Sequence, residues 1–480
     1  MKKTFRKLTS LVLALLFTAS LPLTALADVV LNIAEGSIAI DNINATQNDN
    51  VQPHGGTVIV TGTNTSPEHN VSVDVTSNVT VVLQDTTINT YDASSTLNDA
   101  AVEINTNSSN AVVTVELNGT NTLTSDSRHA GLEISGTGSV VIQDETSLVE
   151  GKLVDTPDGG SLTATGGTNS AGIGGEVGDS ASNITITGGT VTATGRVSAA
   201  GIGGGKGGSA DNITITGGTV TATGGANAAG IGGGEGGSAS NITITGGNVT
   251  AEGRAHGAGI GGGDEGDAGN ITITGGTVFA NGGGWAPGIG SGSDGSVGTV
   301  AISGGTVTAT GGKGGAGIGG EVTEDTSITF SGDAQVTAIG GTGAPAIGGA
   351  EAVEPDISNL SADGWYQAVS GENYVAATPT AQAETVEQRG WFAVNARWSQ
   401  SLQDGILTVT SSQVDAALNI KGWGIRGLRS SGIHTLVFVT AKAQTTLDIA
   451  KLAAECDGAD VYILTHTGEK TELTCNGEIA

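Results

Sequence analysis

The side chains best suited to chemistry in this sequence are carboxylates set in a glycine-rich segment. Asp264, Glu265 and Asp267 stand together in the run GGGDEGDAG, and Asp294 lies 29 residues after Glu265, in the corresponding run of the next repeat. Hard oxygen ligands on flexible loops suit calcium. The nine-residue GGxGxD pattern of calcium-binding rolls is missing from the sequence. A calcium site and a solvated acidic loop are therefore both open interpretations.

Two aromatic residues in the same region suggest a different chemistry. Trp285, in GGGWAPG, stands where sibling segments carry small residues, and Phe279 interrupts a row of threonines. An exposed ring beside polar groups stacks well on the apolar face of a sugar. Together with Thr272 and Thr274, these residues form the candidate carbohydrate-binding set. The alternative for Trp285 is local packing over the adjacent loop.

Catalytic patterns leave little trace in the sequence. A lyase or hydrolase needs carboxylates or a basic residue that face one another, whereas the residues at the outward positions here are mainly threonine. The six histidines show neither a triad-like nor a metal-ligand spacing. Because function must be argued from a site, we expect a protein that is not an enzyme.

These candidate residues all lie within a repeat of fixed length. The phrase NITIT opens at Asn183, Asn212, Asn241 and Asn270, and the isoleucine of GIG recurs at Ile173, Ile202, Ile231, Ile260, Ile289 and Ile318. Successive copies are 29 residues apart. A period in this range, held through many copies, indicates a repeat architecture in which each unit covers the next.

The content of the repeat predicts short strands. NITIT and TVTAT alternate apolar and hydroxylic residues, which is the periodicity of a strand, and glycine pairs separate them at the corners. With AGIGG as a third strand, the sequence predicts an all-β, right-handed parallel β-helix with 29-residue turns over residues 161–350.

Stacked turns predict a core made of files of like residues, spaced about 4.8 Å apart. The two clearest expected files are Ile184, Ile213, Ile242, Ile271 and Val300, and Val191, Val220, Val249, Val278 and Val307. We also expect the repeated asparagines to form a hydrogen-bonded side-chain ladder. The outward threonine rows resemble the flat arrays of ice-binding solenoids, although threonine is also a good outward strand residue.

The chain begins with the pattern of an export signal. Residues 1–27 combine a basic start, an apolar run from Leu11 to Phe17 and a small-residue cleavage site, which predicts a secreted protein. The apolar run is too short to span a bilayer with these flanks, and nothing later approaches the length of a span. Residues 28–160 contain further alternating runs, which predict irregular opening turns and a cap.

The charge balance argues against a nucleic-acid partner. The net charge is −29, and without the signal 14 Lys and Arg face 47 Asp and Glu. Affinity for nucleic acid depends on neutralising phosphates with Lys and Arg, so this class of partner is excluded from our interpretation. An acidic, glycine-rich chain outside the cell fits better.

The composition changes after residue 350, where four of the five tryptophans occur. Residues 356–480 are predicted to form a small α+β domain, with a strand from His434, a helix from Thr445 and a hairpin that turns at Thr467 and Gly468. The only cysteines are Cys456 and Cys475. In an exported chain they form a candidate disulfide, with two buried thiols as the alternative.

The succession of motifs resembles a known family. VTVVLQDTTINT, AAVEIN, VVTVELNGTNTLTS, HAGLEIS, SLTATGG, SAGIGG and NITITGGTVTATGG follow one another over roughly residues 55–350. This order is similar to the carbohydrate-binding-domain proteins that Gram-positive bacteria, clostridia among them, secrete as right-handed parallel β-helices. The resemblance implies polysaccharide binding, in some members with calcium. It assigns no site residue in this chain.

We therefore expect a secreted, non-catalytic solenoid that binds extracellular or cell-wall polysaccharide, requires no cofactor, has calcium as an optional ligand, and has no transmembrane span after signal cleavage. One alternative is a cell-surface adhesin or spacer that projects the C-terminal domain. Another is a polysaccharide-degrading enzyme on the same scaffold. The chain ends at TCNGEIA with neither a sorting motif nor a hydrophobic tail, which favours release of the protein or a fragment of a longer chain.

Overall fold

The computed structural model describes most of the chain from residue 28 onward. The described residues are 28–64, 66–91, 99–125, 128–144, 147–149, 152–154, 159–361, 363–371, 392–394, 398–403, 405–411, 414–421, 425, 428–429, 433–455, 461–468, 470–475 and 478–479. The predicted export signal, residues 1–27, lies outside them. No helix among the described residues is long and apolar enough to cross a membrane.

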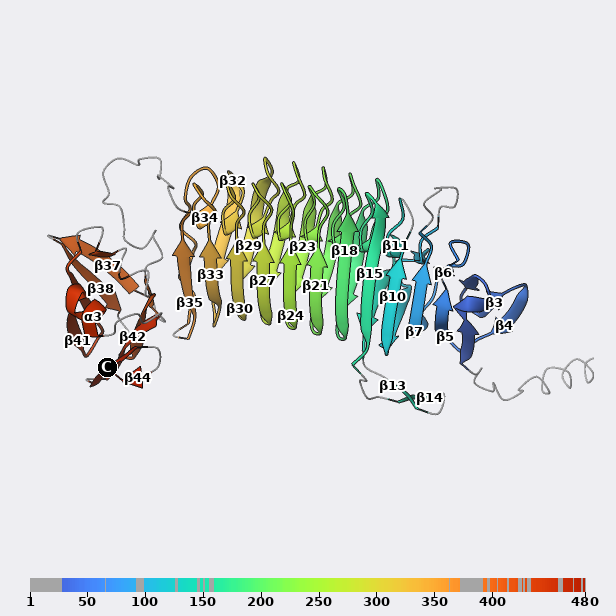
Figure 1. Ribbon diagram of the computed structural model, residues 1–480, viewed down its shortest axis with the longest axis horizontal. Helices are drawn as coiled ribbons and strands as arrows, with labels where there is room; N and C mark the ends of the chain where they lie inside the picture. Colours follow the sequence, from blue (N-terminus) through green and yellow to red (C-terminus); the bar gives the residue numbers. More distant parts are fainter. Residues whose placement is uncertain are drawn as a thin grey trace, which may run out of the picture.

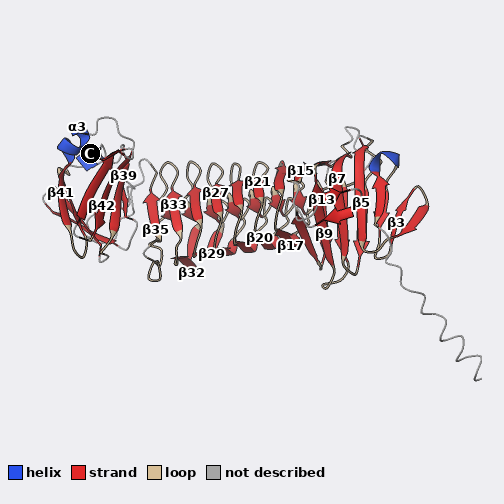
Figure 2. Cartoon of the chain, turned by 90° about the horizontal axis from the view of Figure 1, so that it is seen from below, coloured by secondary structure: helices blue, strands red, loops and turns tan. Residues whose placement is uncertain are grey.

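The described residues between 29 and 369 form a parallel β-helix of about 12 turns (Figures 1 and 2). The first strand of each turn comes from β9 (Val112–Asn118), β12 (Ser139–Gln143), β17 (Ala181–Ile186), β20 (Ala210–Ile215), β23 (Ala239–Ile244), β26 (Ala268–Ile273), β29 (Ser296–Ile302) and β32 (Glu321–Phe330). The second comes from β10 (Thr120–Thr124), β15 (Ser161–Thr168), β18 (Thr190–Arg196), β21 (Thr219–Thr223), β24 (Asn248–Glu252), β27 (Thr277–Asn281), β30 (Thr306–Thr310), β33 (Gln335–Ile339) and β35 (Trp365–Val369).

The third strand of each turn is short and belongs to a separate 13-stranded sheet. Its parallel members are β2 (Ile38–Ile40), β6 (Val71–Val75), β8 (Val102–Thr106), β11 (Leu132–Gly136), β16 (Ile173–Gly174), β19 (Ile202–Gly203), β22 (Ile231–Gly232), β25 (Ile260–Gly261), β28 (Ile289–Gly290), β31 (Ile318–Gly319) and β34 (Ile347–Gly348). The first two faces join in one 20-stranded sheet, because β7 (Val79–Asn89) pairs with both β9 and β10.

The strands pair in the register that the 29-residue period predicts. Ile184 pairs with Ile213, and that file continues through Ile242 and Ile271 to Val300. The valine file from Val191 to Val307 is likewise continuous. These side chains are at most 1% exposed. The two predicted files are confirmed. Together with the equally buried isoleucine files that contain Ile186 and Ile202, they supply the large apolar side chains whose burial is the main source of stability.

The repeated asparagines have a backbone role that the sequence pattern did not reveal. Asn183, Asn212 and Asn241 have φ angles of 56°, 52° and 55°, a left-handed conformation that asparagine tolerates better than most residues. The expected ladder is only partly formed. Asn212 donates to Asn183 and Asn270 donates to Asn241, but Asn241 donates to the carboxylate of Asp211.

Antiparallel strands cover the N-terminal end of the stack. β2 pairs in parallel with β6 on one side and antiparallel with β3 (Asn44–Gln47) on the other, and β3 forms a hairpin with β4 (Asn50–Pro53). β1 (Val29–Asn32) belongs to the parallel stack, where it pairs with β5 (Thr57–Asn64). A 3-10 helix, η1 (Ile33–Glu35), joins β1 to β2. A second hairpin of β13 (Ser147–Val149) and β14 (Lys152–Val154) projects between β12 and β15.

The stack continues past residue 350, where the sequence analysis ended it. β35, which contains Trp365, pairs in parallel with β33, so the predicted domain limits at 350 and 356 fall inside the β-helix. The 29-residue period is lost there although the pairing is not. Larger rings close this end, where Phe330 follows Ile302 in its file and lies 5.6 Å from the ring of Tyr366.

The described part of the C-terminal domain contains two small sheets and the helix α3. One sheet contains β36 (Phe392–Val394), β39 (Ala416–Lys421), β42 (Val461–Thr467), β43 (Lys470–Cys475) and β44 (Glu478–Ile479). The other contains β37 (Trp398–Gln403), β38 (Ile406–Ser411), β40 (Thr435–Val439) and β41 (Gln444–Asp448).

The helix α3 (Ile449–Glu455) begins four residues later than predicted. Thr445 and Leu447 belong instead to β41, which pairs with β40. Asp448 ends that strand, and its side chain accepts hydrogen bonds from the backbone N–H groups of Ala450 and Lys451. This cap satisfies free donors at the start of the helix and sets where it begins.

We predict that Ile244→Asp abolishes cooperative unfolding of the β-helix. Ile244 is fully buried between Ile215 and Ile273, so the variant would bury an unpaired charge, at a cost of several kcal/mol. Thermal unfolding followed by circular dichroism measures the effect. Thr245→Asp is the matched control, because Thr245 is exposed in the same turn. An unchanged melting curve for Ile244→Asp would contradict the stacked core.

We predict that the C-terminal domain loses stability as the pH falls below about 6.5, the ordinary histidine value. Burial lowers the pKa of His466, so the unfolded chain takes up the proton first and stability falls by at most about 1.4 kcal/mol per pH unit. Amide hydrogen exchange of β42 in the full chain measures this loss. His466→Gln should remove this pH dependence, whereas His434→Gln, at an exposed histidine, should keep it. If the stability of both variants changed equally with pH, the dependence would not come from His466.

Candidate functional site

From β16 onward, the third strand of each turn is only two residues long, so the loops on either side of it lie close together. We call the loop before it the leading arc and the loop after it the trailing arc. The backbone N–H of Asp264, in a trailing arc, donates to the carbonyl of Asn227 in the leading arc of the preceding turn. The N–H of Ser293 donates to His256 in the same way. Polar residues from both arcs therefore gather along one edge.

The trailing arcs contain one position whose residue type differs in each of five successive turns. Val177, Lys206, Glu235, Asp264 and Ser293 occupy equivalent positions, 29 residues apart. We call these five residues the variable column. Within it, Lys206 Nζ lies 3.1 Å from Glu235 Oε1. The residue just before each member is Glu176 in the first of these turns and glycine in the later ones. A Cβ on Gly234, for example, would lie 2.0 Å from the carbonyl oxygen of Gly205.

The predicted acidic set bonds to protein groups around it. Asp267 accepts hydrogen bonds from the N–H and hydroxyl of Ser296, at 2.9 and 2.7 Å. Asp264 Oδ1 lies 3.7 Å from His256 Nδ1, and burial raises the pKa of this carboxyl. Glu265 and Asp294 are exposed at equivalent left-handed positions. Among the described residues, no group of three close metal-ligating atoms includes any of these four.

Trp285 is both packed and exposed. Its side chain lies over Gly314 of the next turn, where an added Cβ would come within 2.4 Å of the ring atom Cε3. Lys313 Nζ lies 5.9 Å from the ring centroid, within cation–π range. Trp285 nevertheless remains 54% exposed. The ring packs on the adjacent loop and still leaves an exposed surface, so local packing and a stacking surface are compatible interpretations of Trp285.

Trp285 forms one wall of an open hollow of about 770 Å³, which Ser293, Asp294, Gly320 and Glu351 also line. The hollow exists because one trailing arc is shortened. Gly319 follows Gly290 by 29 residues, but Glu321 follows Ser296 by only 25. The arc that would cover Ser293 and Asp294 is thus four residues shorter, and the space above them is open.

The remaining predicted sugar-binding residues do not line this hollow. Phe279 is 43% exposed on β27, paired between Thr250 and Thr308. Thr272 is on β26, and Thr274 follows that strand, on another face of the coil. In the structure, therefore, Trp285 lines the hollow, and the other three residues of the predicted set lie outside it.

The candidate disulfide is described at one end only. Cys475 is in β43 and is disulfide-bonded, and Cys456 lies outside the described residues. The pairing of the two stays a prediction.

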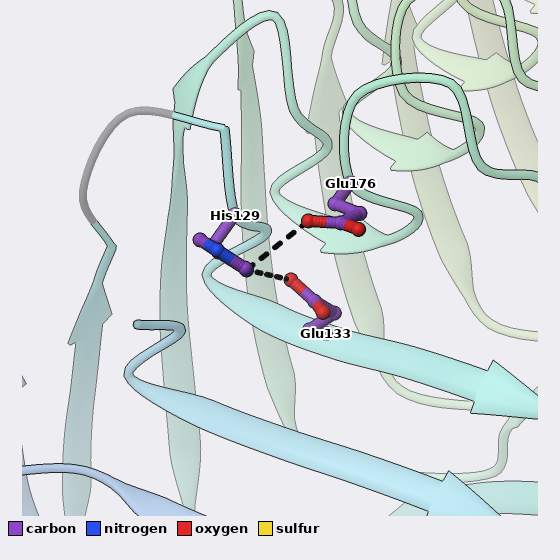
Figure 3. Close-up of side chains that lie close together, drawn as sticks. All are labelled: His129, Glu133 and Glu176. Carbon is purple, nitrogen blue, oxygen red and sulfur yellow. Dashed lines mark hydrogen bonds and ion pairs between the residues drawn. The ribbon is translucent and has the colours of Figure 1, made fainter. Parts of the chain in front are cut away.

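A second cluster, not foreseen from the sequence, lies where the irregular turns meet the regular repeats (Figure 3). His129 precedes β11, Glu133 is within β11, and Glu176 comes from the trailing arc after β16, one turn later. His129 Nδ1 lies 2.8 Å from Glu133 Oε2 and 3.3 Å from Glu176 Oε2. These atoms all lie within 4.8 Å of one another.

The electrostatics of this cluster follow from burial and crowding. Burial, and then the neighbouring Glu133 carboxylate, raise the pKa of Glu103 and that of Glu176. Burial alone would lower the pKa of His129, but its hydrogen bond to Glu133 and the charges of the surrounding glutamates raise it overall. Glu103 and Glu133 are neighbours in one file, because β8 and β11 pair directly.

The cluster has a weak sequence signal. HAGLE places a histidine and a glutamate four residues apart on a short strand, but Glu176 is 43 positions further on and meets them only through the stacking. The file of glutamates ends at Gly174, whose φ of 132° and whose close approach to Gly203 exclude a side chain. Aligning the two irregular turns with the first regular one would have brought the three residues together.

The comparison with protein families matches only the repeats. A family model described as Beta helix repeat matches residues 158–179, 184–206, 213–235, 242–264, 271–293 and 300–320. No curated protein and no solved structure matches the chain significantly.

We predict that Gly314→Ala displaces the indole of Trp285, since the added Cβ would overlap the ring. Fluorine NMR of protein labelled with 5-fluorotryptophan, with the signal assigned by Trp285→Phe, should show this one resonance shifted. Gly269→Ala is the control, because its Cβ would meet no atom closer than 3.3 Å. An unmoved Trp285 resonance in Gly314→Ala would show that the ring does not rest on the glycine.

Proposed function

Residues 158–320 are an array of β-helix repeats, and on this premise we propose that the protein is a secreted, non-catalytic carbohydrate-binding solenoid. The observation that carries the proposal is the half-exposed indole of Trp285 at the wall of the hollow. A flat aromatic surface beside polar groups is the arrangement that binds the apolar face of a sugar ring.

The other groups in the hollow suit the hydroxyls of a glycan. Asp294 and Glu351 present carboxylates that accept hydrogen bonds from sugar hydroxyls, and Ser293 both donates and accepts. Lys313, beside the indole, adds a donor at the rim.

Location and cofactor are part of the same proposal. The export pattern of residues 1–27 supports action outside the cell, on cell-wall or other extracellular polysaccharide. The acidic trailing arcs of Asp264 and Asp294 keep calcium as an optional ligand. The mainly threonine outward rows support binding without catalysis.

A spacer or adhesin is the second candidate function. The parallel stack holds the C-terminal domain and the N-terminal end far apart (Figure 1), as a projecting element would. In that case the hollow would bind no glycan. Retention on polysaccharide therefore separates the two functions.

We predict that Trp285→Ala weakens retention on insoluble polysaccharide about tenfold, which corresponds to about 1.4 kcal/mol, because the stacking surface is lost. Pull-down against a panel of plant and cell-wall polysaccharides, with and without chelator, measures retention. Phe279→Ala is the matched control, because it removes an exposed ring outside the hollow.

Each outcome of that experiment has a defined meaning. Equal retention of Trp285→Ala and the unmodified protein would exclude the hollow as the binding site. Absence of retention on every polysaccharide would favour the spacer. Soluble sugar released in the same tubes would reveal an enzyme and overturn the non-catalytic proposal.

A further inference from the structure

The structure assigns a second site, distinct from the hollow, to His129, Glu133 and Glu176, and we propose that it binds a divalent cation of the zinc class. Three observations carry this proposal. They are the convergence of ligand atoms from two turns, the way His129 is held, and the local balance of charge.

The convergence is specific in its atoms. One imidazole nitrogen and one oxygen from each of two carboxylates approach within 4.8 Å of one another, and Figure 3 shows Glu133 and Glu176 both directed at the same nitrogen of His129. Zinc binds nitrogen and oxygen ligands at about 2.0–2.2 Å, so ligand atoms around one ion lie about 3–3.6 Å apart. Small side-chain adjustments bring the three atoms to that spacing.

His129, a partly buried histidine, is held differently from the fully buried His54 and His466. Both ring nitrogens of His466 bond threonine hydroxyls, and both of His54 bond backbone groups. His129 Nε2 is buried without a hydrogen-bond partner among the described residues, and Nδ1 contacts carboxylates alone. The partly buried His69 likewise has one ring nitrogen, Nδ1, without a hydrogen-bond partner among the described residues. The His129 ring therefore has no hydrogen bond to the backbone that fixes a structural histidine, and its one engaged nitrogen faces two anionic ligands.

Among the described residues, carboxylates outnumber cations around His129. Glu103, Glu133 and Glu176 surround it, and the cations that act on Glu176 are His129 itself and Arg128. The side chain of Glu133 is only 9% exposed. Crowded carboxylates raise one another's energy unless a cation lies between them. A divalent ion neutralises two of them, whereas a protonated histidine neutralises one.

The ligand set selects the class of ion. Calcium takes six to eight oxygen ligands, more than two glutamates supply, and it has little use for imidazole. One imidazole and two carboxylates suit zinc, with a fourth position for water. Glu176 is 34% exposed, so solvent reaches that side of the cluster. On the buried side, Glu133 Oε2 is held in place by a hydrogen bond that it accepts from the backbone N–H of Ala130.

An ion bound here would connect two successive turns. Glu133 belongs to the last irregular turn. Glu176 belongs to the next turn, the first in which a glycine, Gly174, pairs at the position of Glu133. The third-strand contact between these turns consists of two residue pairs. The cation would therefore fasten the stack at the point where its repeat changes length.

The test is titration of the full-length, untagged, chelator-treated protein with Zn²⁺ alone in a calorimeter, with Ca²⁺ in a parallel titration. We expect one Zn²⁺ per chain, bound at least tenfold more weakly by Glu176→Gln. Later turns carry glycine at the position of Glu176, so this variant should keep the fold. Asp179→Asn, in the same exposed arc, removes an equal charge and should bind Zn²⁺ as the unmodified protein does.

Nitrogen NMR of histidine-labelled protein gives a second measurement. We expect Zn²⁺ to shift the Nδ1 resonance of His129, assigned by His129→Gln, and to leave His466 unchanged. Three results would overturn the proposal: no Zn²⁺ binding, equal weakening in Glu176→Gln and Asp179→Asn, or a His129 resonance that saturating Zn²⁺ does not move. Tighter binding of Ca²⁺ than of Zn²⁺ would overturn the assigned class.

Discussion

The structure depends on hydrogen bonding between each strand and the same strand one turn away. In a parallel ladder this bonding fixes the spacing of the turns, so in the regular turns each strand residue stands over its equivalent 29 positions earlier. A side chain that fits one turn must fit against its own kind in the next. Isoleucine and valine files satisfy this in the core, and glycine satisfies it in the arcs. At Gly205 an added Cβ would lie 1.8 Å from a carbonyl oxygen.

The sequence was informative wherever this constraint acts. The periodic isoleucines and valines predicted the fold class, the strands and the register of the core, because identical residues at fixed spacing have one simple arrangement. The prediction was wrong where the period stops: β35 continues the stack without it, and Thr445 and Leu447 join a strand because β40 offers a free edge. The residue pattern of one segment does not reveal which other strand that segment will pair with.

The two candidate sites both arise from interruptions of the repeat. The hollow beside Trp285 exists because the connection before Glu321 is short, and the His129 cluster exists because Glu133 occupies a file that glycine occupies later. Trp285 was visible in the sequence as an aromatic residue in a glycine arc. The sequence did not show that Glu351 lies near Trp285 or that Glu176 lies near His129, because only the coiling of the chain brings these residues together.

The variable column from Val177 to Ser293 has a consequence for how such a chain changes over time. Its members touch the solvent edge and not the apolar files, so replacing one leaves the ladder and the core intact. Duplicating or deleting a whole 29-residue unit likewise adds or removes one member of the column without disturbing the rest. The surface chemistry of the rod can therefore diversify one position at a time, while selection for folding holds the interior nearly constant.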